Sequence, residues 1–115
     1  MMIFIELWNP GEKWKEMSAE EQKRFISELI AKLEDLDGQG GIELMGWGSQ
    51  IGVVDRKLPY ELFALWQVPD EAELGRLQAG LRDAGWYDYV DQVNVAGDLL
   101  PSPTDALMQA AKRAE

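Results

Sequence analysis

Apolar residues recur along this chain with two periods, and each period predicts one kind of element. In residues 3–8 aliphatic side chains alternate with others, as they do in a strand with two different faces, and turn residues follow at 9–11. Across Ala19–Leu36 the large apolar residues recur at helical spacing, and Ser18 with Glu21 forms a capping box before them. The first third of the chain therefore predicts a strand followed by a helix.

The middle of the chain predicts two further strands. Residues 42–47 alternate again, and this strand extends to Val54 if a bulge lies near Gly46–Gln50. Tyr60–Val68 is a run of aromatic and aliphatic residues that stops at Pro69, so we expect a third strand there.

The last part of the chain predicts a second helix, a fourth strand and a tail. Asp70 begins another capping box, and Gly85 suits the left-handed position that closes the helix. Tyr89–Ala96 is expected to be the fourth strand. Residues 100–115 are expected to be a tail with a short helix that Thr104 caps.

The predicted order is strand, helix, strand, strand, helix, strand. Right-handed crossovers convert this order into an α+β ferredoxin-like sandwich with two helices on one face and sheet order 4-1-3-2. A chain of 115 residues is of ordinary size for one domain, so we expect residues 1–115 to form a single domain.

The same alternation assigns side chains to the two faces of the sheet. We expect the helices to cover Ile3, Ile5, Leu7, Ile42, Leu44, Val93 and Val95. The side chains expected on the opposite, outward face are Phe4, Glu6, Trp8, Glu43, Met45, Trp47, Gln92 and Asn94. Tyr60–Val68 is apolar on both sides, and we place its mixed set outward, namely Glu61, Phe63, Leu65 and Gln67. A face so rich in aromatic residues is rarely left in water, so we expect a second copy of the chain to cover it and close a homodimeric α/β barrel.

The composition of the chain limits which partners and which catalytic groups it can have. The formal net charge of −10 repels phosphate and anionic lipid, so we expect neither nucleic acid nor a membrane as a partner. The chain has no Cys and no His, which excludes disulfides, thiol and imidazole catalysis and most metal sites; we expect no metal and no cofactor. The start MMIFIELW lacks the basic start and small-residue cleavage site of a signal peptide, so a cytoplasmic location is expected.

Polar residues of the outward face are the candidate site. Glu6 or Glu43, walled by aromatic rings, would lose solvation, have a raised pKa and act as general acid or base. The amides of Gln67 and Asn94 would orient a substrate oxygen. The residues expected to wall the pocket are Trp8, Trp47, Phe63 and Trp66. The alternative is that these polar groups only fix the register of a dimer interface.

Three segments carry a family resemblance. WKEMSAEEQKRF (Trp14–Phe25), YELFALWQVPD (Tyr60–Asp70) and GWYDYVDQVNVAG (Gly85–Gly97), together with the element order, resemble the dimeric α+β barrel superfamily and, within it, an uncharacterised family of hypothetical proteins. That superfamily includes cofactor-independent monooxygenases and muconolactone isomerase. Because its oxygen-using members work with Trp, Tyr and amide side chains, the resemblance implies a role for Trp66 and Asn94. The uncharacterised family brings no established reaction.

Two functional hypotheses follow. The first is a small-molecule enzyme of isomerase or monooxygenase type, without metal or organic cofactor, that binds a small aromatic or carbonyl compound between sheet and helices or at the barrel mouth. The second is a non-catalytic ligand-binding or interaction homodimer whose aromatic face is only an interface.

Overall fold

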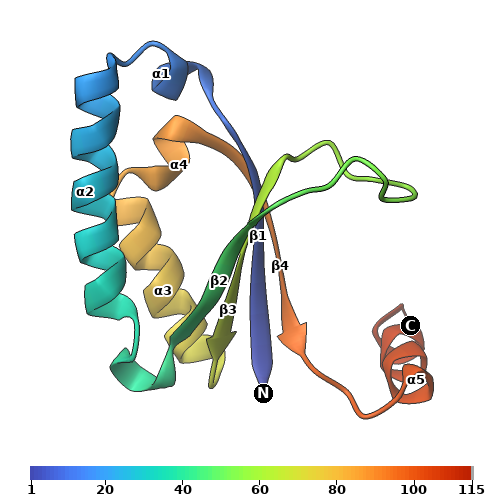
Figure 1. Ribbon diagram of the computed structural model, residues 1–115. Helices are drawn as coiled ribbons and strands as arrows, with labels where there is room; N and C mark the ends of the chain where they lie inside the picture. Colours follow the sequence, from blue (N-terminus) through green and yellow to red (C-terminus); the bar gives the residue numbers. More distant parts are fainter. Residues whose placement is uncertain (115) are drawn as a thin grey trace.

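Four strands form one antiparallel sheet in the order β2-β3-β1-β4 (Figure 1). The computed structural model describes residues 1–114. The strands are β1 (Met2–Pro10), β2 (Glu43–Ser49), β3 (Leu62–Val68) and β4 (Val90–Asp98). This is the predicted α+β ferredoxin-like arrangement, with the sheet order 4-1-3-2 read from the other edge.

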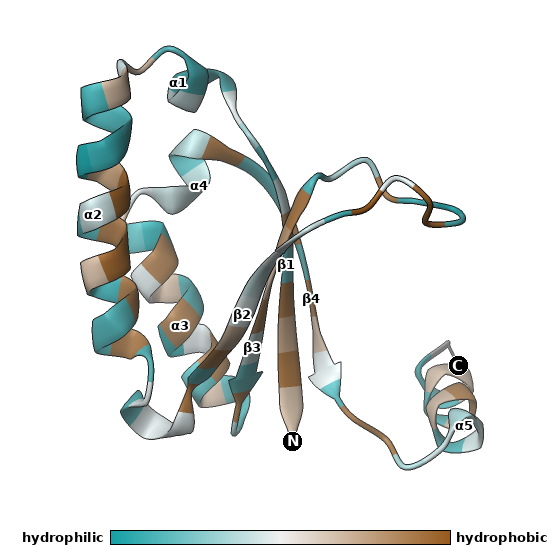
Figure 2. Cartoon of the chain, viewed as in Figure 1, coloured by the Kyte–Doolittle hydropathy of each residue, from teal (hydrophilic) through white to brown (hydrophobic). Residues whose placement is uncertain are grey.

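Helices α2 (Ala19–Leu36) and α3 (Glu71–Asp83) cover one face of the sheet (Figure 1). The predicted caps are present: Glu21 N donates to Ser18 Oγ at 3.1 Å, and Glu73 N donates to Asp70 Oδ1 at 2.9 Å. The bounds of α2 match the prediction because both of its ends are determined locally. The apolar stripe of α2 faces the sheet (Figure 2).

Three single-turn elements were not predicted: α1 (Glu12–Lys15), the 3-10 turn η1 (Gln39–Gly41) and α4 (Trp86–Tyr89). Gly85 takes the expected left-handed conformation, with φ 80°. The chain then makes the extra turn α4 instead of entering the fourth strand, and this turn buries Trp86 against the core.

Two segments lie on the side of the sheet that is opposite to α2 and α3 (Figure 1). The first is the loop 50–61, because β2 ends at Ser49 and does not continue to Val54 as expected. The second is α5 (Pro103–Ala114). Its N-cap is Ser102 and not Thr104 as expected, because Asp105 N donates to Ser102 Oγ at 3.2 Å. Large apolar side chains are exposed in both segments, namely Ile51, Val53, Val54, Leu58, Leu107 and Met108.

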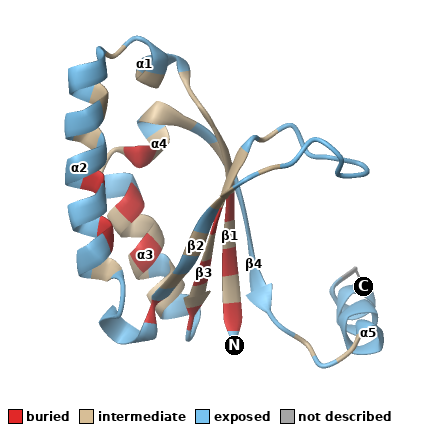
Figure 3. Ribbon diagram, viewed as in Figure 1, coloured by how far each residue is buried: buried red, intermediate tan, exposed pale blue. Residues whose placement is uncertain are grey.

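The face assignment of β1 and β4 was wrong. Phe4 pairs with Trp66 and Glu6 with Ala64, and all four are buried beneath the helices (Figure 3). β1 carries large apolar side chains on both sides, so alternation alone could not show which side the helices cover. The register of β1 with β3 determines it. The residues moved from the outward to the helix-covered face of these two strands are Phe4, Glu6, Trp8, Gln92 and Asn94.

The opposite side of the sheet, which α2 and α3 leave uncovered, is here called the open face. Its side chains are Ile3, Ile5, Leu7, Glu43, Phe63, Leu65, Gln67, Val93 and Val95. The outward assignment of Phe63, Leu65 and Gln67 on β3 is confirmed, and Ile3, Ile5, Leu7, Val93 and Val95 are corrected to this face.

A β-bulge corrects the position of Trp47. The register of β2 on β3 shifts between Leu44 and Gly46, at the near end of the region where a bulge was expected. The extra residue brings Trp47 opposite Ala64, so its indole lies on the helix-covered face and not on the outward face.

No helix within residues 1–114 is long and apolar enough to cross a membrane.

Candidate functional site

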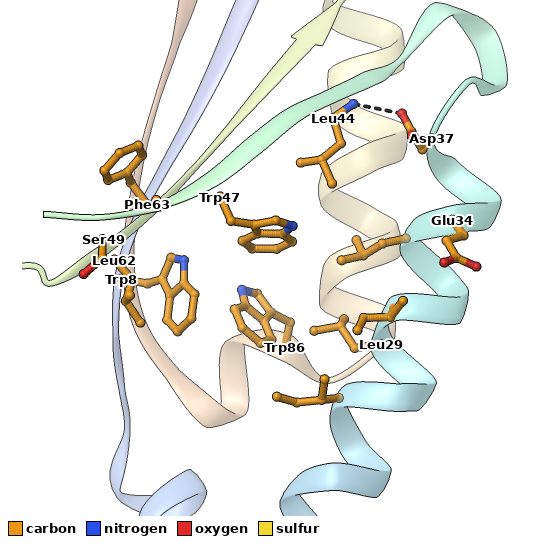
Figure 4. A pocket seen from close by; sticks show the side chains of 14 residues that line it. Trp8, Leu29, Glu34, Asp37, Leu44, Trp47, Ser49, Leu62, Phe63 and Trp86 are labelled. Atoms are coloured by element: carbon orange, nitrogen blue, oxygen red, sulfur yellow. Dashed lines mark hydrogen bonds between the residues drawn. The ribbon is translucent and has the colours of Figure 1, made fainter.

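A cavity of about 630 Å³ lies between α2 and the helix-covered face of the sheet (Figure 4). Three indoles from separate elements line it, Trp8 of β1, Trp47 of β2 and Trp86 of α4, and we call it the indole cavity. Helix α2 supplies the aliphatic wall with Ile26, Leu29, Ile30 and Leu33. The remaining lining residues are Glu34, Asp37, Leu44, Gly48, Ser49, Leu62 and Phe63.

Trp8 is the centre of the aromatic cluster. Its ring meets that of Trp86 at 5.0 Å and 77°, and that of Trp47 at 6.5 Å and 90°, so both contacts are edge to face. The three side chains converge on the cavity in Figure 4. Trp8 Nε1 is buried and has no hydrogen-bond partner in the described part of the chain.

Glu6 lies beside this cluster and is fully buried. Trp66 Nε1 donates to its Oε1 at 2.6 Å, and Gln92 Nε2 donates to its Oε2 at 2.7 Å. Burial raises the pKa of Glu6 above its usual range, and the two donated hydrogen bonds act in the opposite direction. The result is a desolvated carboxyl whose two oxygens are both engaged.

Gln92 connects this carboxyl to the cavity wall. It accepts from Trp86 Nε1 at 2.7 Å, and its amide nitrogen also donates to Asn94 Oδ1 at 2.7 Å. Trp86 therefore lines the indole cavity on one side and hydrogen-bonds the Glu6 network through its nitrogen. Burial raises the pKa of the neighbouring Tyr87, and the negative charge of Glu6 raises it further.

The structure brings together most of the predicted site residues. Glu6 and Trp66 are hydrogen-bonded, and Asn94 joins them through Gln92. Trp8 and Trp47 line the indole cavity as expected, whereas Trp66 does not. These groups meet under the helices because the faces of β1 and β4 are the reverse of those expected.

Three predicted residues are not part of this arrangement. Glu43 and Gln67 pair with each other across β2 and β3 on the open face, away from Glu6. The ring of Phe63 lies on the other side of the strand from the three indoles (Figure 4), although the residue borders the cavity. Within residues 1–114 no group of three acidic side chains is placed to hold a metal ion.

Sequence reasoning missed Trp86 as a site residue, and Gln92 was named only as part of the outward face. The signal for Trp86 was its place directly after the helix-closing Gly85, where a large apolar residue folds back on the helix. Gln92 is opposite Trp8 in the β1–β4 register, and only that pairing shows its role.

The fold is similar to that of several solved structures. A "Putative Chlorite dismutase" superposes with a TM-score of 0.65 at 19% identity over 86% of this chain, which spans 43% of that protein's chain. A dimeric ferredoxin-like protein of unknown function from Thermobifida fusca gives a TM-score of 0.53 at 14% identity, over 85% of this chain and 90% of that one. A protein of Arabidopsis thaliana gives a TM-score of 0.56 at 13% identity, over 89% of this chain and 96% of that one. At these identities the likeness shows the fold alone.

No curated protein sequence matches the chain. A family model does match, over residues 1–112, which is nearly the whole chain. The expected ferredoxin-like fold and the expected uncharacterised family are both confirmed. The chain belongs to DUF6616, a family of unknown function.

Proposed function

We propose that this protein binds a small, mostly apolar compound in the indole cavity. The observation that carries the proposal is the cavity itself, which is about 630 Å³ in volume and is walled by Trp8, Trp47, Trp86 and the aliphatic side of α2. Ligand pockets in proteins typically measure about 300–1,000 Å³ and are lined mainly by apolar and aromatic side chains with few polar groups.

Exposure of the lining supports this proposal. Ile26, Ile30 and Trp47 are 41%, 48% and 48% exposed, although each points its apolar surface to the same hollow. Contiguous apolar surface of this kind commonly marks a binding site. A compound seated between α2 and β2 would cover all three side chains.

We also propose that the protein is a homodimer joined through the open face. Ile3, Ile5, Leu7, Phe63 and Leu65 form an apolar patch there, and Val95 beside them is 56% exposed. Two such sheets face to face would bury the patch and form the α/β barrel expected from the sequence. The related fold from Thermobifida fusca is described as dimeric, which favours this arrangement.

A second candidate function is cofactor-independent catalysis of isomerase or monooxygenase type on an aromatic or carbonyl compound. It is favoured by the buried carboxyl of Glu6, whose raised pKa suits a general acid or base. Glu6 does not line the cavity, however, and is reached from it through Trp86 and Gln92. Catalysis therefore requires those two side chains to move, whereas filling the open cavity does not, and we place binding first.

The formal net charge of −10 supports a small-molecule ligand over nucleic acid or anionic lipid as the partner. The cytoplasmic location expected from the sequence is kept as part of the same proposal.

Ligand binding is tested by a thermal-shift screen of uncharged aromatic compounds, followed by calorimetry. At a hundredfold excess over its dissociation constant a ligand adds about 2.7 kcal/mol to the free energy of unfolding. Ile30→Trp places a large ring at the half-exposed mouth of the cavity and should abolish binding. Ala31→Trp is the matched control, because Ala31 is exposed on the same helix and does not line the cavity. A screen without hits, or hits that Ile30→Trp leaves intact, would contradict the proposal.

Dimerisation is tested by sedimentation. The wild type should sediment as a dimer, and Val95→Lys, which places a cation on the open face beside Ile5, on the edge strand β4, should yield a monomer. Ala31→Lys adds the same charge on α2 and should leave the dimer intact. A monomeric wild type would contradict this part of the proposal without affecting the indole cavity.

A further inference from the structure

We propose that the ligand of the indole cavity is an uncharged aromatic compound with a carbonyl or ether oxygen, and that this oxygen accepts a hydrogen bond from Trp8 Nε1. The inference rests on the proposed binding function and names the chemical class of the ligand.

The nitrogen of Trp8 is the one polar side-chain atom, among the described residues, that is buried without a partner. A buried donor left without an acceptor costs free energy, and native structures satisfy nearly all such groups. Two neighbouring indoles show how this protein usually does so: Trp66 donates to Glu6, and Trp86 donates to Gln92. An acceptor for Trp8 is missing from the part of the chain that the structure describes, so we assign it to the ligand.

The position of Trp8 makes this assignment specific. Trp8 lines the cavity and lies between Trp47 and Trp86, which meet it edge to face. A flat ring that enters the cavity packs against these indoles. An oxygen on its edge can then accept from Trp8 Nε1, the one buried side-chain donor without a partner among the described residues, once the indole of Trp8 turns this nitrogen toward the cavity, because the nitrogen is enclosed while the cavity is empty. The arrangement orients the ligand as well as holding it.

Charge around the cavity excludes an anionic ligand. The charged side chains that line it, within residues 1–114, are Glu34 and Asp37, and both are acidic. Asp37 Oδ1 already accepts from Leu44 N at 2.8 Å. A carboxylate bound here would be desolvated without a cation and would face two like charges, which is unfavourable on both counts. A neutral ketone or ether avoids this cost.

Three probes with one ring system test the inference: indane, 1-indanone and indane-2-carboxylate, titrated into the full chain by calorimetry. Indane measures binding in the cavity alone. The ketone of 1-indanone supplies the acceptor and should bind about tenfold more tightly than indane, the gain expected of one buried hydrogen bond. The carboxylate should bind at least about tenfold more weakly than indane.

The variant Trp8→Phe removes the N–H and keeps an aromatic ring at position 8. It should reduce the preference for 1-indanone over indane to less than about twofold, whereas Trp14→Phe, the same change outside the cavity, should keep the full preference. A measurement on the unmodified chain covers the case in which Trp8→Phe does not fold. With nitrogen-15 labelling, one indole proton signal should move downfield with 1-indanone and not with indane.

The outcomes separate the two proposals. Equal affinity for indane and 1-indanone would overturn the inference and leave cavity binding standing, because the N–H would then be satisfied by a neighbouring ring face. Tightest binding of the carboxylate would overturn it as well. If none of the three probes binds, the proposed function fails and the inference fails with it.

Discussion

The indole of Trp66 donates its N–H to the buried carboxylate of Glu6 at 2.6 Å, across 60 residues of sequence. The two residues lie on neighbouring strands in the centre of the sheet, and neither is accessible to solvent. A carboxyl in such a place is tolerated only because its oxygens are hydrogen-bonded. This contact joins the core of the fold to the network that leads through Gln92 to the indole cavity.

Trp66→Phe is expected to destabilise the protein by about 2–4 kcal/mol, because it removes a hydrogen bond to a buried charged group and leaves a void. Urea denaturation measures the loss. Trp14→Phe is the control, since Trp14 packs against Phe25 outside the core cluster and should cost less than about 1 kcal/mol. Equal losses for the two variants would contradict the importance assigned to the Glu6 contact.

The stability of the protein should depend on pH through Glu6. Burial raises the pKa of this carboxyl above its ordinary value of 4.5 in the folded state, so the folded state binds its proton more tightly. Its stabilising contribution is fully present below the unfolded pKa and is lost as pH rises through the folded pKa. Between the two values the free energy of unfolding should fall by at most about 1.4 kcal/mol per pH unit.

Glu6→Gln tests this dependence. The variant should show a smaller decline in stability with rising pH than the wild type, measured by urea denaturation from mildly acidic to neutral pH. Its amide nitrogen will face the amide nitrogen of Gln92, which adds a constant penalty, so the slope is the readout and not the absolute stability. Glu43→Gln, which removes an exposed carboxylate on the open face, is the control. Parallel curves for wild type and Glu6→Gln would refute the assignment.

Tyr87 should titrate at a lower pH when Glu6 is neutralised. Burial is the larger cause of its raised pKa and the charge of Glu6 the next, so Glu6→Gln removes one of the two. The tyrosinate absorbance of each protein, minus that of its Tyr87→Phe counterpart, isolates this residue. Glu43→Gln lies on the other face of the sheet and should leave the Tyr87 titration where it is. An unchanged titration in Glu6→Gln would show that the two groups are not electrostatically coupled.

Gly48→Ala should destabilise the protein by about 1–3 kcal/mol through overpacking. A Cβ at position 48 would overlap the ring of Phe63, so the ring that covers this glycine must move. Thermal unfolding of Gly48→Ala and of Gly48→Ala with Phe63→Leu measures the effect, and the second change should restore part of the loss. Gly52→Ala is the control, because nothing lies within 4 Å of a Cβ at that glycine. Equal stability of the two glycine variants would contradict this packing.

Local features of this chain were predictable because their causes are local. The cap at Ser18, the cap at Asp70 and the left-handed Gly85 each depend on a few consecutive residues, and the structure has all three. The order of elements then leaves few topologies, and the ferredoxin-like sheet is one of them. Glu6 was chosen as a polar residue of the expected outward face and Trp66 through the family resemblance; the structure places the two in contact, but under the helices.

Tertiary structure alone decided which face of each strand is covered. Residues 3–8 carry large apolar side chains on both sides, so only the pairing of Phe4 with Trp66 determined that Glu6 lies under the helices. The bulge after Leu44 turned Trp47 to the same side, and the turn at α4 brought in Trp86. The sequence by itself determined the elements and their order, because hydrophobic period and capping act over short distances. The cavity, its unpaired Trp8 nitrogen and the Glu6 network required the register of four strands, because that register brings together side chains distant in sequence.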